Sequence, residues 1–297
     1  MGAWAWGDRR YWGYGRDYGR ADVEAAYHAS RVAGLTLFDT AEGYGRGTSE
    51  RLLGEFLRSP DGAGAQVATK FAPLPWRTGR RKPVADALQA SLQRLQRERL
   101  ELYQIHWPLP LLSDRAWLDG IADAVAEGKV GAVGVSNYGP AKLRRAHETL
   151  ARRGVPLATD QVAYSLLDRK PERSGLVETC RDLGVTFIAY SPLAQGLLTG
   201  KYSSSSRPPG VRGLRYRRML PQLPSLLGTL VEIGQDHGGK TAAQVALNWL
   251  IAHDTLPIPG AKTADQASHN AGGVGWRLGD AHLALLDQLR LQPPDAV

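Results

Sequence analysis

Four residues capable of acid–base or electrostatic chemistry follow successive apolar segments of this chain. They are Asp39 in LTLFDT, Tyr44 five residues later, Lys70 in VATKF and His106 in LYQIHW. A free phenol has a pKa of ~10, too high for efficient proton donation at neutral pH. A neighbouring lysine ammonium is expected to lower that pKa, and an aspartate paired with the lysine keeps the ammonium charged. A histidine across the pocket then orients a carbonyl group by a hydrogen bond.

Such a set polarises a carbonyl group and delivers a proton to its oxygen. It contains no metal site and no covalent nucleophile, so reduction of the carbonyl requires a cofactor. Each residue also has an ordinary explanation, for example Asp39 as a turn cap or His106 as a hydrogen-bonded core residue. Their joint occurrence at the ends of successive apolar segments is what favours one active site.

The elements that must position these residues are short strands alternating with amphipathic helices. The eight candidate strands are 2–7, 35–40, 66–71, 102–107, 131–137, 157–164, 185–193 and 255–261. The helical patterns between them are 21–34, 49–59, 82–96, 116–128, 140–154, 172–184 and 241–254. Most strand candidates are continuous apolar runs, which is typical of strands buried on both faces.

This alternation predicts an α/β fold, a (β/α)8 TIM barrel forming a single domain over 1–297. Cofactor and active site are expected at the C-terminal ends of the strands. An open doubly wound sheet is the alternative, weakened by the lack of a GxGxxG motif after the first strand. The long segment 194–224, rich in Ser, Pro, Gly and Arg, is expected to be a βα loop over the cofactor site. An extra helix is expected over 223–238.

Composition indicates a globular protein of 297 residues, 43% hydrophobic and 22% charged. No apolar run approaches the ~20 residues that span a bilayer, and no signal peptide is evident. The single cysteine, Cys180, excludes an intrachain disulfide and fits a reducing cytoplasm. The net charge of +8 comes from scattered basic residues, so we expect neither a nucleic-acid nor a membrane partner. The seven histidines form no HxxxH or HxH pair, so no metal site is expected.

Seven ordered motifs resemble those of the aldo-keto reductase family: LFDTAEGYG, VATKF, IHWP, GVSNYG, DQVAYSLL, YSPLAQGLLTGKY and IPGAKTADQASHNAG. The similarity covers essentially the whole chain, and KYSSSS, RRMLPQL and GGVGWRL resemble the branch known from plastids and cyanobacteria. The resemblance implies NADPH-dependent reduction of aldehydes or ketones to alcohols. It implies that Tyr44 is the general acid, that Lys70 lowers its pKa, that Asp39 pairs with Lys70 and that His106 orients the carbonyl.

The resemblance also implies an extended NADPH site across the barrel mouth. Its implied residues, from the nicotinamide to the adenine end, are Ser136, Asn137, Gln161, Tyr190, Ser191, Leu193, Gln195, Gly196, Lys201, Gly260, Lys262, Thr263, Gln266 and Asn270. Lys262 and Thr263 match the site of the adenosine 2′-phosphate, and a lysine and a hydroxyl on a turn that opens a helix suit a phosphate. Gln266 replaces a frequent arginine and His269 a frequent glutamate, so the size of the NADPH preference is open.

The small-molecule carbonyl substrate is expected to meet aromatic walls. The candidates around the mouth are Trp6, Tyr11, Trp12, Trp76, Trp107, Tyr138 and Arg207, of which Trp12, Trp76 and Trp107 are the predicted substrate-binding residues. A short tail, 290–297, predicts an open pocket. Met1 almost coincides with the first expected strand, so the hairpin usual before it is lacking in this branch or lost by truncation. Without that hairpin, apolar residues at the bottom of the barrel are expected to be exposed, which would lower the stability of the protein.

Two other functions stay open at this point. One is a nucleotide-binding redox sensor or regulatory subunit with the same fold and little turnover. The other is an unrelated barrel enzyme, such as a phosphate-sugar isomerase or a metal hydrolase. The presence of all four candidate catalytic residues favours an enzyme, while the physiological substrate and the oligomeric state cannot be read from the sequence.

Overall fold

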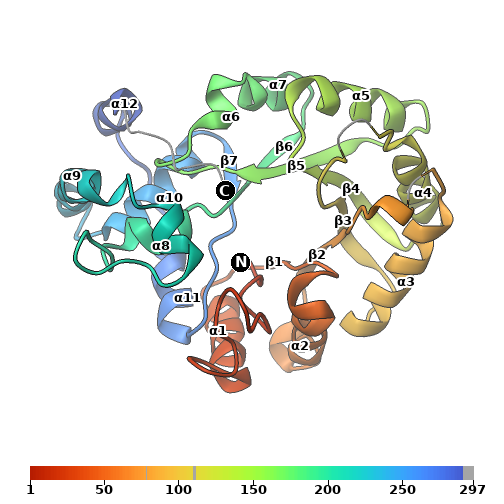
Figure 1. Ribbon diagram of the computed structural model, residues 1–297, viewed down its shortest axis with the longest axis horizontal. Coiled ribbons are helices and arrows are strands. Elements are labelled where there is room, and N and C mark those ends of the chain that lie inside the picture. Colours follow the sequence, from red (N-terminus) through yellow and green to blue (C-terminus); the bar gives the residue numbers. More distant parts are fainter. Residues whose placement is uncertain (78, 110–111, 290–297) are drawn as a thin grey trace.

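A parallel sheet that curls into a ring dominates the computed structural model, which describes residues 1–77, 79–109 and 112–289 (Figure 1). Neighbouring strands pair in chain order. The seven strands of the described residues are β1 Leu37–Asp39, β2 Gln66–Phe71, β3 Leu100–Ile105, β4 Val130–Ser136, β5 Leu157–Ala163, β6 Thr186–Tyr190 and β7 Thr255–Pro257. The predicted α/β barrel architecture is confirmed.

Helices surround this ring of strands (Figure 1). The α-helices are α1 Arg20–Val32, α2 Thr48–Phe56, α3 Lys82–Leu95, α4 Arg115–Ala126, α5 Pro140–Ala151, α6 Lys170–Arg173, α7 Leu176–Asp182, α8 Val211–Arg215, α9 Leu223–Asp236, α10 Ala242–Ala252, α11 Ala264–Ala271 and α12 Asp280–Gln288. Short 3-10 turns are η1 Tyr44–Gly47, η2 Pro60–Gly62, η3 Pro75–Arg77, η4 Ala194–Thr199 and η5 Leu220–Gln222. The helix expected over 172–184 is divided because Gly175 adopts a left-handed φ of 72°.

The ring is closed by an isolated bridge at Gly2 and not by the strand expected over 2–7. Gly2 bridges in parallel to both Asp39 and Gly260. The backbone nitrogen of Gly2 donates to Pro259 O (3.0 Å) and that of Ala3 to Asp39 O (2.8 Å). Residues 4–7 form a turn instead of a strand. The closure therefore brings the chain start beside Asp39, at one edge of the functional face.

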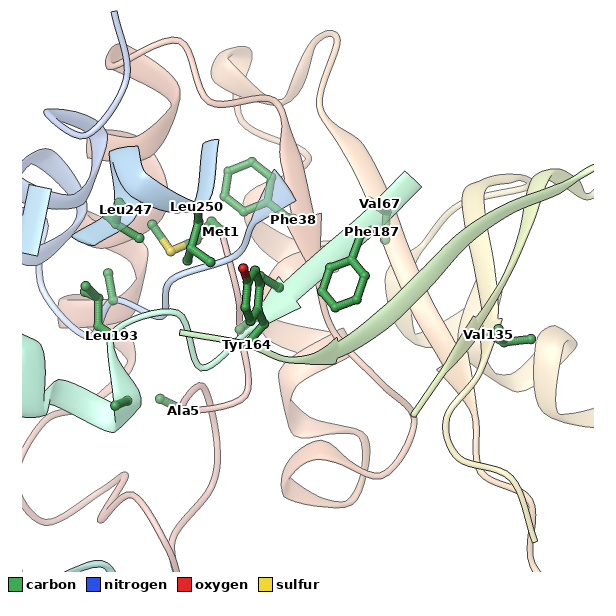
Figure 2. Close-up of a cluster of buried hydrophobic side chains, with 14 of the residues drawn as sticks. Met1, Ala5, Phe38, Val67, Val135, Tyr164, Phe187, Leu193, Leu247 and Leu250 are labelled. Carbon is green, nitrogen blue, oxygen red and sulfur yellow. The ribbon is translucent and has the colours of Figure 1, made fainter. Parts of the chain in front are cut away.

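Strand alternation divides the core into two layers. Outward-facing strand residues pack against the helices, and Figure 2 shows Phe38 of β1, Phe187 of β6 and Leu250 of α10 in this outer core. Inward-facing residues form a smaller cluster that includes Ile188 and Ile258. Leu256 pairs in register with Ile188 and is 40% exposed. The apolar floor of the barrel is therefore partly open to solvent.

Local sequence signals explain where several helices begin and end. Gly34, Gly128 and Gly184 follow α1, α4 and α7 in the left-handed conformation that ends a helix. Thr241 caps α10, with Gln244 completing a reciprocal capping box. None of the helices in the described part of the chain is both long and apolar enough to cross a bilayer.

Candidate active site

A cavity of about 850 Å³ opens where the strands end, and most residues singled out from the sequence line it. These lining residues are Trp12, Asp39, Tyr44, His106, Trp107, Ser136, Asn137, Gln161, Tyr190, Ser191, Leu193, Gln195, Gly196, Lys201, Gly260, Lys262, Gln266 and Asn270. The volume is within the range of cofactor and ligand sites. Segments far apart in the chain thus contribute to one pocket.

A buried ion pair lies behind the pocket wall. Lys70 Nζ donates to Asp39 Oδ1 at 2.5 Å, and the two side chains are 0% and 4% exposed. The same ammonium donates to Thr40 O at 2.8 Å and lies 3.4 Å from Tyr44 Oη. Lys70 itself does not line the cavity, so it acts on the pocket only through Tyr44 and Asp39.

Tyr44 connects this ion pair to the cavity. Gly45 (φ 54°) and Gly47 (φ 82°) let η1 fold back after β1, and a Cβ at Gly45 would lie 2.6 Å from Gly7 O. Burial, and secondarily the Asp39 charge, hold the pKa of Tyr44 well above its usual value. The net pKa of Tyr44 in the free protein is thus above its usual value, and a lowering contribution from Lys70 stays a prediction. The phenol keeps its proton at neutral pH, with the Lys70 ammonium 3.4 Å from its oxygen.

His106 faces Tyr44 across the cavity. The two rings meet edge to face with centroids 5.5 Å apart. Burial, followed by the Lys70 charge, holds the pKa of His106 well below its ordinary value, so the imidazole is neutral at pH 7. Its buried Nδ1 has no hydrogen-bond partner among the described residues. A neutral imidazole can donate a hydrogen bond to a carbonyl oxygen without competing as an acid.

Asn137 links several polar groups on one side of the cavity. It adopts a left-handed φ of 61° after β4. Its Nδ2 donates to His106 O (3.1 Å) and to Ser136 Oγ (3.0 Å), while its Oδ1 accepts from Tyr190 Oη (2.9 Å). Ser136 Oγ in turn donates to Gln161 O (2.7 Å). These hydrogen bonds hold in place the amide and hydroxyl groups that, by the family resemblance, would contact the carboxamide of a nicotinamide cofactor.

The other side of the cavity is cationic. Lys201, Arg212 and Lys262 line it, and burial together with the charges of Arg212 and Lys201 lowers the pKa of Lys262 to about 8. Lys262 Nζ donates to Trp12 O at 2.8 Å, and the buried Nε1 of Trp12 has no partner among the described residues. Three cations and a free indole N–H make a donor set that suits phosphate groups.

Backbone geometry next to these cations also suits an anion. Ser191, Ala194 and Gln195 have φ of 51°, 47° and 55°, and Gly196 has φ of 100°. A Cβ at Gly196 would lie 2.7 Å from Lys201 Cε, and the φ of 100° also favours glycine. Successive turns of this kind present backbone N–H groups to an anion. The residues present therefore fit a phosphate-bearing cofactor.

Several residues expected at the mouth lie elsewhere. Trp76 is 78% exposed and outside the cavity lining, and Arg207 is also exposed. Trp6 is fully buried, with its Nε1 donating to Ala261 O, and Tyr138 is buried with its hydroxyl bonded to Asp114. Thr263 is not a lining residue, because its hydroxyl caps α11 by accepting from Gln266 N.

Trp4 and Arg212 are among the lining residues that were not singled out from the sequence. Trp4 stacks on Tyr11 with centroids 5.0 Å apart and lies 6.2 Å from the Tyr44 ring. Arg212 lies over the Trp12 ring at 4.8 Å. In GAWAW, Trp4 and Trp6 look equivalent, and only the turn over 4–7 sends one to the cavity and the other to the core. Arg212 is one of several arginines in 194–224, with no local signal that distinguishes it.

Comparison with known proteins gives consistent results. A model of the aldo/keto reductase family matches residues 1–290. A chloroplastic pyridoxal reductase of Arabidopsis thaliana is 42% identical, over 100% of this chain and 84% of that protein. A glycerol dehydrogenase structure from Gluconobacter oxydans superposes with a TM-score of 0.83 at 26% identity, covering 97% of this chain and 89% of that chain. The structure of an aldo/keto reductase from Klebsiella pneumoniae in complex with NADP and acetate superposes with a TM-score of 0.74 at 27% identity, covering 100% of this chain and 94% of that chain.

Proposed function

The chain belongs to the aldo/keto reductase family, and from this premise we propose that it reduces an aldehyde or ketone to an alcohol, with NADPH as hydride donor and Tyr44 as proton donor. One observation carries the proposal: the phenol of Tyr44 faces the cavity, and the buried Lys70–Asp39 pair lies directly behind it. Bound NADPH supplies the hydride that forms the new C–H bond.

The proton at the carbonyl oxygen comes from the Tyr44 hydroxyl. As the C=O π electrons move onto oxygen, that oxygen becomes far more basic than a phenolate and takes the proton. The charge left on Tyr44 Oη is then stabilised by the Lys70 ammonium 3.4 Å away. Neutral His106 donates a hydrogen bond to the same carbonyl oxygen and orients it toward Tyr44. Because Asp39 holds Lys70 in place, the ammonium needs no rearrangement during the reaction.

The cofactor is assigned from the donor groups on each side of the cavity. Ser136, Asn137 and Gln161 offer amide and hydroxyl groups for the carboxamide, and Tyr190 offers a ring. Lys201, Arg212 and Lys262 would hold the phosphates, and the 2′-phosphate of NADPH adds one more anion for this cationic side. The preference for NADPH over NADH and a cytoplasmic location both stay predictions. The segment 194–224 contributes Gln195, Lys201 and Arg212 to the lining, which supports its proposed place over the cofactor.

A planar aromatic aldehyde is the substrate class that the cavity walls favour. The Trp4 ring lies beside the Tyr44 ring. The ring centroids of Trp107 and His106 are 4.5 Å apart. Two indoles therefore flank the proposed reacting groups. Flat indole faces suit a flat ring. The Arabidopsis relative is named for pyridoxal, which is an aldehyde on a planar pyridine ring. We therefore include pyridoxal among the substrates to be tested first.

Fluorescence titration with NADPH and NADH, followed by addition of pyridoxal or benzaldehyde, tests the function. We expect tight NADPH binding and its oxidation when aldehyde is added. Tyr44→Phe should lower kcat by ~10²–10⁴ and leave the Kd for NADPH within about twofold, because only the proton donor is lost. Tyr27→Phe is the matched control, since this buried phenol lies outside the cavity. Tight binding without turnover would favour a redox sensor or regulatory subunit, and a fully active Tyr44→Phe would remove Tyr44 from its role.

A further inference from the structure

Below the cavity, the barrel interior contains buried polar side chains that have no part in the reaction as proposed above. Gln104 of β3 and Thr159 of β5 are 0% and 8% exposed, and neither lines the cavity. Gln104 is in register with Lys70 on one side and Gly134 on the other, and Gly134 is in register with Thr159. Because these side chains lie beneath the cavity wall, any effect they have on the reaction must pass through the residues above them.

The two oxygens of Asp39 have different partners. Oδ1 accepts from Lys70, whereas Oδ2 accepts from Gln161 Nε2 at 2.8 Å and lies 3.5 Å from Gln104 Nε2. A buried ion pair is tolerated only when further hydrogen bonds satisfy the carboxylate lone pairs that the cation does not contact. The two side-chain amides supply those bonds to the oxygen that Lys70 does not contact.

Thr159 determines which way the Gln104 amide points. Its Oγ1 donates to Gln104 Oε1 at 3.2 Å, which leaves the amide nitrogen directed at Asp39. Among the described residues, Asp39 is the acceptor that this nitrogen reaches. The pair also explains Gly134, whose φ is not positive: a Cβ there would lie 2.1 Å from Thr159 Oγ1 and 2.8 Å from Gln104 Cγ. The glycine is needed for space.

We propose that Gln104 and Thr159 are positioning residues, which hold the Asp39 carboxylate oriented so that Lys70 stays beside Tyr44. The inference rests on the proposed function of Tyr44 as proton donor. Thr159 orients Gln104, Gln104 and Gln161 hold Asp39 Oδ2, and Asp39 Oδ1 holds Lys70. Loss of the Gln104 amide removes one donor from Asp39 Oδ2 and lets the carboxylate rotate, so the ammonium no longer has a fixed place behind the phenol.

Gln104→Met and Thr159→Val test this directly, since both keep the side-chain volume and remove the polar groups. We expect kcat to fall about tenfold with KM within about twofold, because a weakened bond to a charged group is worth roughly that factor. Thr159→Ser keeps the hydroxyl and is the matched control expected to restore near-parental kinetics.

A second measurement needs neither cofactor nor turnover. The loss of Tm caused by Gln104→Met should be larger in the parent than in the double variant Asp39→Asn with Lys70→Met, where the group that accepts the Gln104 hydrogen bond carries no charge. An equal loss in both backgrounds would indicate packing alone and overturn the proposal. So would folded variants with unchanged kcat.

The two tests separate the two hypotheses. If the parent oxidises no NADPH with any aldehyde, the proposed function fails, while the difference in Tm loss between the two backgrounds still decides the role of Gln104. If Gln104→Met does not fold, Thr159→Val supplies both measurements, because it leaves the Gln104 side chain in place. An active parent with variants that match its kcat would refute the positioning role alone.

Discussion

The Lys70–Asp39 pair gives the sharpest prediction, because removing one of its charges and removing both have different consequences for stability. Lys70→Met leaves the Asp39 carboxylate with a side chain only 4% exposed and no cation at 2.5 Å. An uncompensated buried charge costs ~3–5 kcal/mol of unfolding free energy. For a chain of this size, ~1 kcal/mol corresponds to about 2 °C in Tm, so a fall of roughly 6–10 °C is expected.

The double variant Asp39→Asn with Lys70→Met removes both charges. Its Tm should return most of the way to that of the parent, because an amide leaves no unpaired charge in the interior. Activity should stay low in both variants, since neither has a cation beside Tyr44.

Thermal unfolding followed by circular dichroism between pH 4 and pH 8 measures these effects, with Lys82→Met as a control for loss of a lysine at an exposed ion pair. The reasoning would be refuted by a Lys70→Met protein as stable as the parent at pH 7. It would equally be refuted by a double variant less stable than the single one, because the cost would then come from lost packing and not from the orphaned charge.

The remaining predictions concern two other titratable groups. Burial raises the pKa of Asp160 well above its usual value, against a smaller opposing effect from the backbone N–H of Tyr138. An acid whose pKa is higher in the folded state than in the unfolded state (~3.9) costs stability as pH rises above that unfolded value. Asp160→Asn should therefore raise Tm at pH 8 and change it little at pH 4; an equal shift at both would contradict this. The pKa of Lys262 is about 8, so affinity for NADPH should fall as pH rises through that value and the ammonium is lost. Lys262→Met should weaken binding at pH 7 and flatten this dependence in fluorescence titrations; an unchanged pH profile would place the phosphates elsewhere.

The sequence by itself predicted the alternation of strands and helices, because apolar runs and amphipathic patterns are local properties. It also identified Asp39, Tyr44, Lys70 and His106, because strand ends can be recognised locally and parallel strands of a barrel end on one face. The structure brings these four together, with Lys70 behind the cavity wall, and burial leaves the pKa of Tyr44 above its usual value and not below it. Burial decides that direction, and burial depends on everything packed around the phenol.

Only the tertiary structure decided which similar residues face the cavity. Trp4 and Trp6 are two residues apart in one short segment, yet the turn over 4–7 exposes one to the cavity and buries the other. Gln161 reaches Asp39 across 122 positions of sequence, and Gln104 across 65. Such contacts depend on strand register and on closure of the ring at Gly2. No local pattern specifies them, because ring closure is a property of the whole chain.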